Sequence, residues 1–159
     1  MQVRKARIKD IEQIKTVFME YEEASVNYIP KKYQYLRKKK GPLNQKIKLA
    51  LTKDIKEKDS LFLVAEENHK VVGYIFGKIR DDKHPLFNPP KTGELDTVAV
   101  LKSHQGKGIS SKLWKELLKW FAKKKCVFIT LSVNSNNPAQ EIYKKWGFEL
   151  FYLRMIRKV

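Results

Sequence analysis

Two glycines standing between a β-branched run and an amphipathic repeat place the tightest constraint on how this chain folds. Residues 95–101 (LDTVAVL) are typical of a strand, whereas apolar residues at helical spacing begin at Ile109. Gly106 and Gly108 lie between the two. Glycine permits a sharp turn and a close backbone approach, and the helix behind it begins with unpaired N–H groups and a partial positive charge. This order predicts either a plain connecting turn or a loop that binds a pyrophosphate.

Common nucleotide-binding and catalytic motifs that use such a turn are absent. The Walker pattern G-x-x-x-x-G-K-[ST] does not occur, and the dinucleotide pattern G-x-G-x-x-G fails because Ser111 stands at its third glycine. His69, His84, His104 and Cys126 lack the spacing of a zinc site, and no G-x-S-x-G nucleophile elbow is present. The sequence predicts no metal site and no covalent enzyme intermediate.

The glycine turn (residues 105–111) resembles the acyl-CoA pyrophosphate loop of the GNAT superfamily of N-acyltransferases, whose pattern is [QR]-x-x-G-x-[GA]. Residues 105–109 (QGKGI) fit this pattern in register, and Ser110, which departs from it, is small enough to keep the backbone close to a ligand. Lys107 and Lys112 add positive charge beside the turn. The preceding residues 98–100 (VAV) resemble the central strand of the family.

A second stretch carries the same resemblance. Residues 135–148 (SNNPAQEIYKKWGF) are similar to the family pattern N-x-x-A-x-x-x-Y-x-x-x-G-F, and the matching positions are Asn136, Ala139, Tyr143, Gly147 and Phe148. The two motifs occur in the order found in the family, about 30 residues apart. Their agreement extends the resemblance over most of the chain.

The resemblance implies an α/β (α+β) fold in which residues 1–159 form a single N-acetyltransferase domain. Its central sheet would be mixed and mostly antiparallel, with about six or seven strands flanked by about four or five helices. The patterns in the chain predict strands at 3–8, 61–66, 71–79, 95–101, 127–133 (buried) and 150–156. They predict helices at 11–24, 43–55, 109–123 and 138–146, with Asp10 and Gln13 forming a capping box for the first.

The resemblance also implies acetyl-CoA as the acyl donor and CoA as a product. In the family, the glycine turn holds the pyrophosphate, the asparagine bonds the pantetheine arm, and backbone amides of the central strand bind the arm and polarise the thioester carbonyl. Carried over position by position, the expected cofactor contacts are Val98, Ala99, Val100, Gln105, Gly106, Lys107, Gly108, Ile109, Ser110, Ser111, Asn136, Ala139 and Tyr143.

Direct acetyl transfer in a ternary complex requires a neutral amine, a polarised carbonyl and a proton for the leaving thiolate. Glu94 matches the glutamate that histone acetyltransferases of the superfamily use, and is the candidate base, acting directly or through a water; Ser132 stands where other members place theirs. Tyr143 matches the general acid of the family. Asp96 shares a strand face with Glu94 unless a bulge intervenes, and is a candidate to hold the acceptor ammonium. The alternatives are that Glu94 only balances nearby lysines and that Tyr143 only packs in the core.

The acceptor pocket is expected to come from the two stretches with the least pattern, 28–58 and 80–92. Tyr28 and Phe87 are the candidate contacts with the acceptor. Three of the six prolines fall within 80–92, which predicts a long loop without regular structure. Such a loop either borders the pocket or is dispensable.

The excess of positive charge predicts that the binding partners are anionic, but it does not choose among the classes of anion. Lys and Arg number 34 against 17 acidic residues, a net charge of +17, which attracts CoA, nucleic acid, acidic proteins or a membrane surface alike. The same charge disfavours a free polyamine as acceptor. The basic run 31–40, with Tyr33 and Tyr35, fits either a single-stranded nucleic-acid surface or a solvated helical face whose tyrosines pack inward, and the second is favoured.

Cysteine content and hydropathy bear on the compartment. The single cysteine, Cys126, cannot form an internal disulfide, and the longest apolar run, 61–65, is far shorter than the roughly 20 residues of a membrane span. The N-terminus has no apolar signal core. A cytoplasmic location without a membrane partner is expected, as a monomer or a homodimer.

The function predicted from these residues is transfer of an acetyl group from acetyl-CoA to a primary amine of a protein, a peptide or a small molecule. The runner-up is a basic nucleic-acid- or ribosome-binding protein that keeps the fold without catalysis. A third alternative is a regulator that binds acyl-CoA. Nucleic acid remains the less favoured partner.

Overall fold

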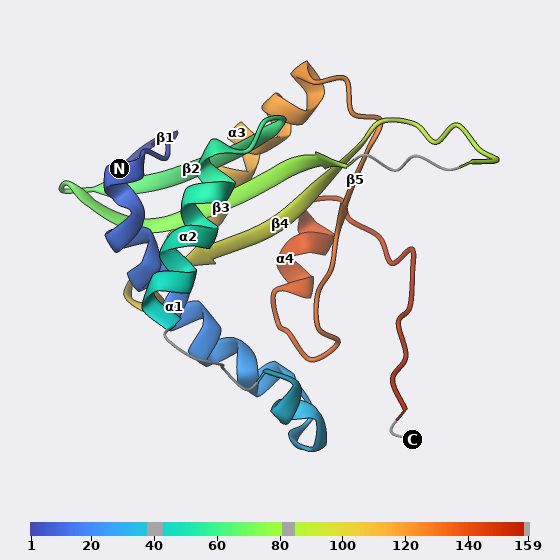
Figure 1. Ribbon diagram of the computed structural model, residues 1–159, viewed down its shortest axis with the longest axis horizontal. Helices are drawn as coiled ribbons and strands as arrows, with labels where there is room; N and C mark the ends of the chain where they lie inside the picture. The colour runs from blue at the N-terminus through green and yellow to red at the C-terminus, as the bar shows by residue number, and fades with distance from the viewer. Residues whose placement is uncertain (38–42, 81–84, 158–159) are drawn as a thin grey trace.

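One five-stranded sheet with helices on both faces makes up the computed structural model of the protein (Figure 1), which describes residues 1–37, 43–80 and 85–157. The strands are β1 (Gln2–Lys5), β2 (Ser60–Glu67), β3 (Lys70–Arg80), β4 (Thr92–Val100) and β5 (Phe128–Leu131). The α-helices are α1 (Ile11–Ser25), α2 (Leu43–Lys56), α3 (Ile109–Lys123) and α4 (Gln140–Lys145). Short 3₁₀ helices are η1 (Ile8–Asp10), η2 (Val26–Tyr28), η3 (Lys31–Arg37) and η4 (Lys102–His104).

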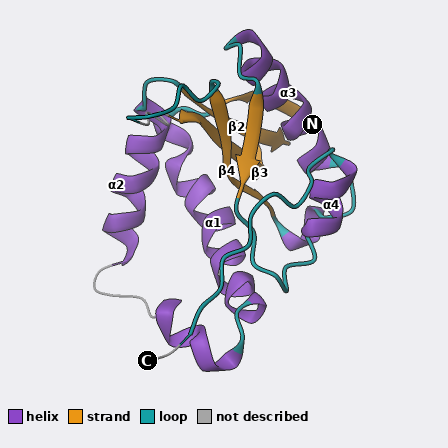
Figure 2. Ribbon diagram, turned by 90° about the vertical axis from the view of Figure 1, so that its right-hand side faces the viewer, coloured by secondary structure: helices purple, strands orange, loops and turns teal. Residues whose placement is uncertain are grey.

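The strands follow one another across the sheet in chain order. Every neighbouring pair is antiparallel except β4 and β5, which run parallel. Seen from the side, α1 and α2 lie on one face of the sheet and α3 and α4 on the other (Figure 2). The structure therefore confirms the α/β class and the mixed, mostly antiparallel sheet.

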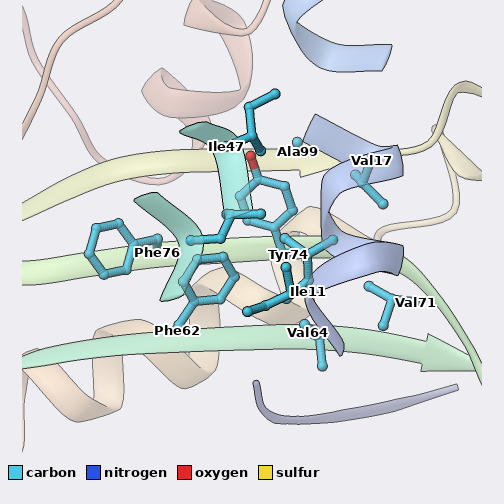
Figure 3. Close-up of a cluster of buried hydrophobic side chains, with 11 residues drawn as sticks. Ile11, Val17, Ile47, Phe62, Val64, Val71, Tyr74, Phe76 and Ala99 are labelled. Atoms are coloured by element: carbon cyan, nitrogen blue, oxygen red, sulfur yellow. The ribbon is translucent and has the colours of Figure 1, made fainter. Parts of the chain in front are cut away.

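Each face of the sheet buries its own apolar core. Under α1 and α2, Ile11 and Ile47 pack with the strand residues Phe62, Tyr74 and Phe76 (Figure 3). The buried face of α3 comprises Ile109, Leu113, Trp114, Leu117 and Phe121.

Helix α3 approaches the sheet closely because two strand residues beneath it have no side chain. A Cβ on Gly93 would lie 2.4 Å from Phe121, and one on Gly77 would lie 2.9 Å from Leu117 and Phe121. Contacts that close are not tolerated by packed side chains. The two glycines thus set the height of α3 above β3 and β4.

A bulge interrupts β4 in its middle. Phe76 pairs with Thr97 and the next residue, Gly77, pairs with Leu95, so Asp96 is the extra residue on β4. An extra residue reverses which face the following side chains take. Leu95 accordingly packs under α3, whereas Ala99, four residues on, packs under α1 and α2.

The C-terminal part of the chain departs from the prediction. Residues 149–157 form no strand, so the sheet has five strands and not the six or seven predicted. β5 has four residues, and Val127 and Phe128 are exposed where a buried strand was predicted. Helix α4 begins at Gln140, two residues later than predicted.

The predicted capping box at the start of α1 is also wrong. The Gln13 side chain accepts a hydrogen bond from the Val71 N–H at 2.7 Å, so it ties the helix to β3 instead. The Asp10 carboxylate is buried and accepts hydrogen bonds from the Arg4 guanidinium and from the Arg7 N–H. The hydrogen bond from Arg4 is the main reason that the pKa of Asp10 is lowered. β3 has taken the Gln13 side chain, and Arg4 and Arg7 have taken the Asp10 carboxylate, so neither group is left to cap α1.

Candidate functional site

The glycine turn has the geometry of an anion-binding loop. Gly106 and Gly108 adopt φ angles of +75° and +72°, and an added Cβ at either would meet open space, so glycine serves the backbone conformation there. No main-chain N–H of residues 106–111 donates to an acceptor in the described part of the chain. The first N–H that returns to the backbone is that of Lys112, to the Gly108 oxygen at 3.1 Å. A row of free amides at the start of a 15-residue helix favours a bound anion.

A pocket of about 440 Å³ opens beside this turn. Its lining comes from the turn, the first turns of α3 and the face of α4, namely Gly106, Gly108, Ser110, Ser111, Trp114, Lys115, Ile142, Lys145 and Trp146. The Trp146 Nε1–H donates to Ser111 Oγ at 3.3 Å, and the Trp146 ring stacks on Trp114 with centroids 5.2 Å apart. Helix α4 is thereby fastened to α3, and two lysines bring positive charge to the space between them.

The backbone of β4 is open on one side beyond the middle of the strand. Pairing with β5 ends at Leu95 and Leu131, whereas pairing with β3 continues to Val100. Because the Leu101 N–H donates to Val72 on β3, strand alternation turns the main-chain groups of Val98 and Val100 away from β3. The Val100 oxygen accepts a hydrogen bond from Gln105 Nε2 at 3.1 Å, which secures the glycine turn to the end of the strand. The main-chain N–H and C=O groups of Val98 therefore point to the side of β4 along which β5 no longer runs.

Tyr143 occupies the wall of the site that α4 provides. Its ring meets Trp146 and Phe148 edge-on, with centroids 5.6 and 6.2 Å away. Burial, with a smaller effect from nearby Tyr21, raises the pKa of Tyr143 to about 12. Its hydroxyl therefore keeps its proton throughout the neutral range. Asn136 is exposed, and its neighbour Asn137 accepts a hydrogen bond from the Ala139 N–H at 2.9 Å in the turn before α4.

The two carboxylates of β4 meet at one lysine. Lys78 Nζ lies 3.4 Å from the Asp96 carboxylate and 3.9 Å from that of Glu94, so both side chains reach the same cation in spite of the bulge. Burial acts to lower the pKa of Lys78, but Asp96 and Glu94 outweigh it and leave that pKa raised. Both carboxylates are partly exposed, at 28% for Glu94 and 37% for Asp96.

Comparison with known proteins decides the family. The profile of the acetyltransferase (GNAT) family matches residues 16–148, most of the chain. The chain belongs to this family. Family membership confirms the predicted enzyme class, an acetyl-CoA-dependent N-acetyltransferase, and does not favour the nucleic-acid-binding alternative.

Individual relatives agree with this assignment. An N-alpha-acetyltransferase of Sulfurisphaera tokodaii is 29% identical over 157 residues, covering 92% of this chain and 79% of the relative. The solved tetramutant of the BH1408 protein from Bacillus halodurans superposes with a TM-score of 0.86 at 18% identity over the full length of both chains. Ribosomal-protein-alanine N-acetyltransferase from Brucella melitensis biovar Abortus 2308 gives a TM-score of 0.70 at 14% identity, again over both full chains. These solved structures confirm the GNAT fold.

Three side chains that sequence reasoning missed lie close enough to Asp96 for its charge to act on their pKa values. Tyr21 comes from α1, Asp54 from α2 and Tyr74 from β3. Burial raises the pKa of all three, and the negative charge of Asp96 raises each of them further. Tyr21 is also close enough to Tyr143 to contribute to the rise in the pKa of Tyr143. We call Tyr21, Asp54, Tyr74, Glu94 and Asp96 the acceptor-side cluster.

No local signal in the sequence pointed to Tyr21 or Asp54. Each falls within a helix whose periodicity concerns the core, and each acquires its polar neighbours only through tertiary packing. Asp54 stands near the C-terminal end of α2, where a negative charge is unfavourable for the helix dipole. This unfavourable placement of Asp54 is the one signal in the sequence that could have pointed to a role other than stabilising the helix.

The predicted acceptor contacts lie apart from one another. Tyr28, in η2, is partly buried and close enough to Tyr21 to affect its hydroxyl. Phe87 lies in the loop between β3 and β4 and is 70% exposed. The tyrosines of the basic run also differ: Tyr33 is half-buried, with Lys32 over its ring, whereas Tyr35 is 59% exposed and does not pack inward.

No helix in the described ranges is long and apolar enough to cross a membrane. Within those ranges, no group of three or more His, Cys, Asp or Glu side chains gathers closely enough to hold a metal ion.

Proposed function

We propose that this protein acetylates the N-terminal α-amino group of proteins or peptides by direct transfer from acetyl-CoA. The observation that carries the proposal is the acceptor-side cluster, where Glu94 and Asp96 share Lys78 and Asp96 acts on the pKa of Asp54, on a chain with a net charge of +17. An acidic site on a basic protein suits a single ammonium group. It suits a polycationic small molecule less, because the rest of the surface repels added positive charge.

The ordinary pKa of the amine favours an α-amino group over a lysine. An α-amine has a pKa of roughly 7.7–8.0, so about a tenth of it is neutral at pH 7, whereas a lysine amine has a pKa of about 10.4 and is almost wholly protonated. Lys78 offsets part of the negative charge of Glu94 and Asp96. An acceptor amine that is already partly neutral needs the least proton removal by these carboxylates. The relative from Sulfurisphaera tokodaii, named as an N-alpha-acetyltransferase, supports the same choice.

The proposed roles divide along the site. Bound acetyl-CoA supplies an activated thioester, whose carbonyl carbon the amine nitrogen attacks while the C–S bond breaks. The free amides of residues 106–111 hold the diphosphate, and the Val98 N–H polarises the carbonyl. Glu94 takes the proton lost by the amine, and the Tyr143 hydroxyl gives its proton to the leaving CoA thiolate. Asp96 holds the acceptor ammonium before transfer.

A matched panel of acceptors tests the proposal. Acetyl-CoA is offered with a short peptide that has a free N-terminus and no lysine, with the same peptide N-terminally blocked and carrying one lysine, with an aminoglycoside and with spermidine. Thiol release gives the rate, and mass spectrometry locates the acetyl group. We expect the free N-terminus to react at least tenfold faster than any other amine. Faster reaction of the blocked lysine peptide or of a small amine would overturn the proposed acceptor and leave the enzyme class intact.

A further inference from the structure

Lys78 is a charged residue that follows two core residues on one face of β3. Tyr74 and Phe76 belong to the core under α1 and α2, and side chains two residues apart share a face of a strand. A Cβ on Gly77 would clash with side chains of α3, so Lys78 points to the opposite face, toward α1 and α2. Its side chain is 31% exposed. Lys78 therefore brings its ammonium to the acceptor-side cluster.

The ammonium of Lys78 uses part of the hydrogen-bonding capacity of Asp96. Lys78 Nζ lies 3.4 Å from Asp96 Oδ2, and the Thr97 hydroxyl donates to Asp96 Oδ1 at 2.8 Å. The same Nζ lies 3.9 Å from Glu94 Oε2, and Glu94 stands opposite Lys78 in the register of β3 and β4. A carboxylate oxygen has two lone pairs, so each oxygen of Asp96 can still accept one more donor. One acceptor ammonium can therefore bind here, whereas a second would lie against the like charge of Lys78.

The surroundings of Lys78 are acidic beyond the two carboxylates of β4. Burial acts to lower the pKa of Lys78, but these two carboxylates and Glu57 outweigh it and leave that pKa raised. Burial is also the main reason that the pKa of Asp54, on α2, is raised, and Lys78 acts against that rise, as does the exposed Lys53 more weakly. Four carboxylates thus act together with Lys78. Without its charge, the cluster would have the capacity to bind another cation.

We propose that Lys78 determines the specificity of the acceptor site, because its ammonium stands where a second ammonium of the acceptor would have to bind. This role rests on the proposed function, in which Asp96 holds the acceptor ammonium. With Lys78 in place, the site takes an acceptor with one amino group, such as an N-terminus followed by neutral side chains, and rejects a diamine. Lys78 is then a repulsive element directed against the wrong substrate. Without its charge, the same carboxylates would bind both ammonium groups of one molecule.

A matched pair of peptides measures this selectivity. Both have a free N-terminus and neutral side chains after the first residue, which is norleucine in one peptide and lysine in the other, so they differ only by the second ammonium. The quantity compared is kcat/KM for the norleucine peptide divided by kcat/KM for the lysine peptide. Thiol release gives the rates, and mass spectrometry locates the acetyl group.

Three variants separate the local charge of Lys78 from the charge of the whole protein. Lys78→Met removes the charge and keeps an unbranched side chain, whereas Lys78→Arg keeps the charge. Lys119→Met is the matched control, because Lys119 also forms an ion pair with a carboxylate, Glu116, but lies 72% exposed on α3. Circular dichroism and the thermal shift produced by acetyl-CoA establish that each variant is folded, and Lys78→Gln replaces Lys78→Met if the latter does not fold.

We expect the wild type, Lys78→Arg and Lys119→Met to prefer the norleucine peptide at least tenfold, because like charges placed side by side are costly. Lys78→Met should lose most of that preference, chiefly through a lower KM for the lysine peptide. Any effect of the substitution on Glu94 is common to both peptides and cancels in the ratio.

Two results would overturn the role of Lys78: a ratio that stays at the wild-type value in a folded Lys78→Met or Lys78→Gln variant, and a ratio that falls equally in Lys119→Met. A wild type without the preference would overturn it as well. The proposed function is judged separately, by the panel of acceptors offered to the wild type alone, so its failure is distinguishable from a ratio that Lys78 does not control.

Discussion

Burial is the main factor that suits Tyr143 to the role proposed for it. Its ring packs against Trp146 and Phe148, and the loss of solvent is the main reason that its pKa rises to about 12. A phenol with that pKa is fully protonated at neutral pH, and it is therefore available to a departing thiolate. Tyr21, on the other side of the site, adds to the same effect.

Replacing the hydroxyl tests that role. We expect Tyr143→Phe to lower kcat by about 100-fold, within the range seen for loss of a general acid, because the proton donor disappears. The KM for acetyl-CoA should change little, since the ring keeps its contacts with Trp146. Steady-state thiol release with a free N-terminal peptide measures both quantities. A kcat within twofold of the wild type would rule out the proton transfer.

The raised pKa of Tyr143 also predicts the shape of the pH profile. Activity should rise from pH 6 to pH 9 as the acceptor amine loses its proton, because only the neutral amine attacks. It should not fall again below about pH 10, since the Tyr143 hydroxyl ionises only near pH 12. Initial rates across that range, with stability followed in parallel, give the profile. A descending limb below pH 9 that Tyr143→Phe abolishes would contradict the assignment.

The proposed roles of the two carboxylates of β4, Glu94 and Asp96, can be distinguished by their effects on kcat and KM. Glu94→Gln removes the proposed base and is expected to lower kcat at least tenfold, more strongly at low pH, where less of the amine is already neutral. Asp96→Asn removes a charge from the acceptor-side cluster and is expected to raise the KM for the peptide with a smaller effect on kcat. Glu116→Gln, a partly exposed carboxylate on α3, is the control. Equal effects of the three substitutions would mean that neither role is specific.

At the scale of elements, the site forms where β4 loses one neighbour. β5 ends opposite Leu95, so the last five residues of β4 present backbone to the interior of the site while β3 still supports them from the other side. Helix α3 begins beside that opening with its free amides, and α4 closes it through the stacking of Trp114 on Trp146. The binding groups are therefore mostly main chain, held by rigid elements.

The glycine turn can be tested with two substitutions of equal backbone effect. Gly108→Ala and Gly147→Ala both place a side chain at positive φ, +72° and +88°, with no clash in either case. Each should destabilise the fold by roughly 1–2 kcal/mol. Only Gly108→Ala should also weaken acetyl-CoA at least tenfold, as measured by calorimetry. Equal loss of affinity in both variants would show that the turn is merely a connection.

At the scale of the whole molecule, the net charge is positive whereas the acceptor-side cluster is negative. The net charge of +17 favours an anionic cofactor from every direction, and Lys115 and Lys145 continue it into the pocket. The acceptor-side cluster is acidic. The donor and the acceptor thus approach regions of opposite charge, which keeps a cationic amine out of the diphosphate site.

Salt should consequently act on the two substrates differently. Raising the ionic strength from 50 to 500 mM should weaken acetyl-CoA binding severalfold, because screening removes the attraction between the basic surface and the anion. The KM for a peptide acceptor of neutral side chains should change less, since screening relieves repulsion of its ammonium by the basic surface but also weakens its attraction to Asp96. Calorimetry and initial rates at matched salt provide the comparison. Acetyl-CoA affinity that is indifferent to salt would contradict the proposed electrostatic contribution.

The sequence by itself determined the enzyme family, the α/β class, the glycine turn and the helix behind it, because these depend on residue types at fixed short spacing. Gly106 and Gly108 take positive φ, and Ile109 begins α3, as their spacing predicts. Packing decided the rest: the bulge at Asp96, the early end of β5, the gathering of Tyr21 and Asp54 beside β4, and the unpaired C-terminal segment. Strand register and contacts between distant elements arise from competition among many long-range partners, and no local spacing records which of them wins.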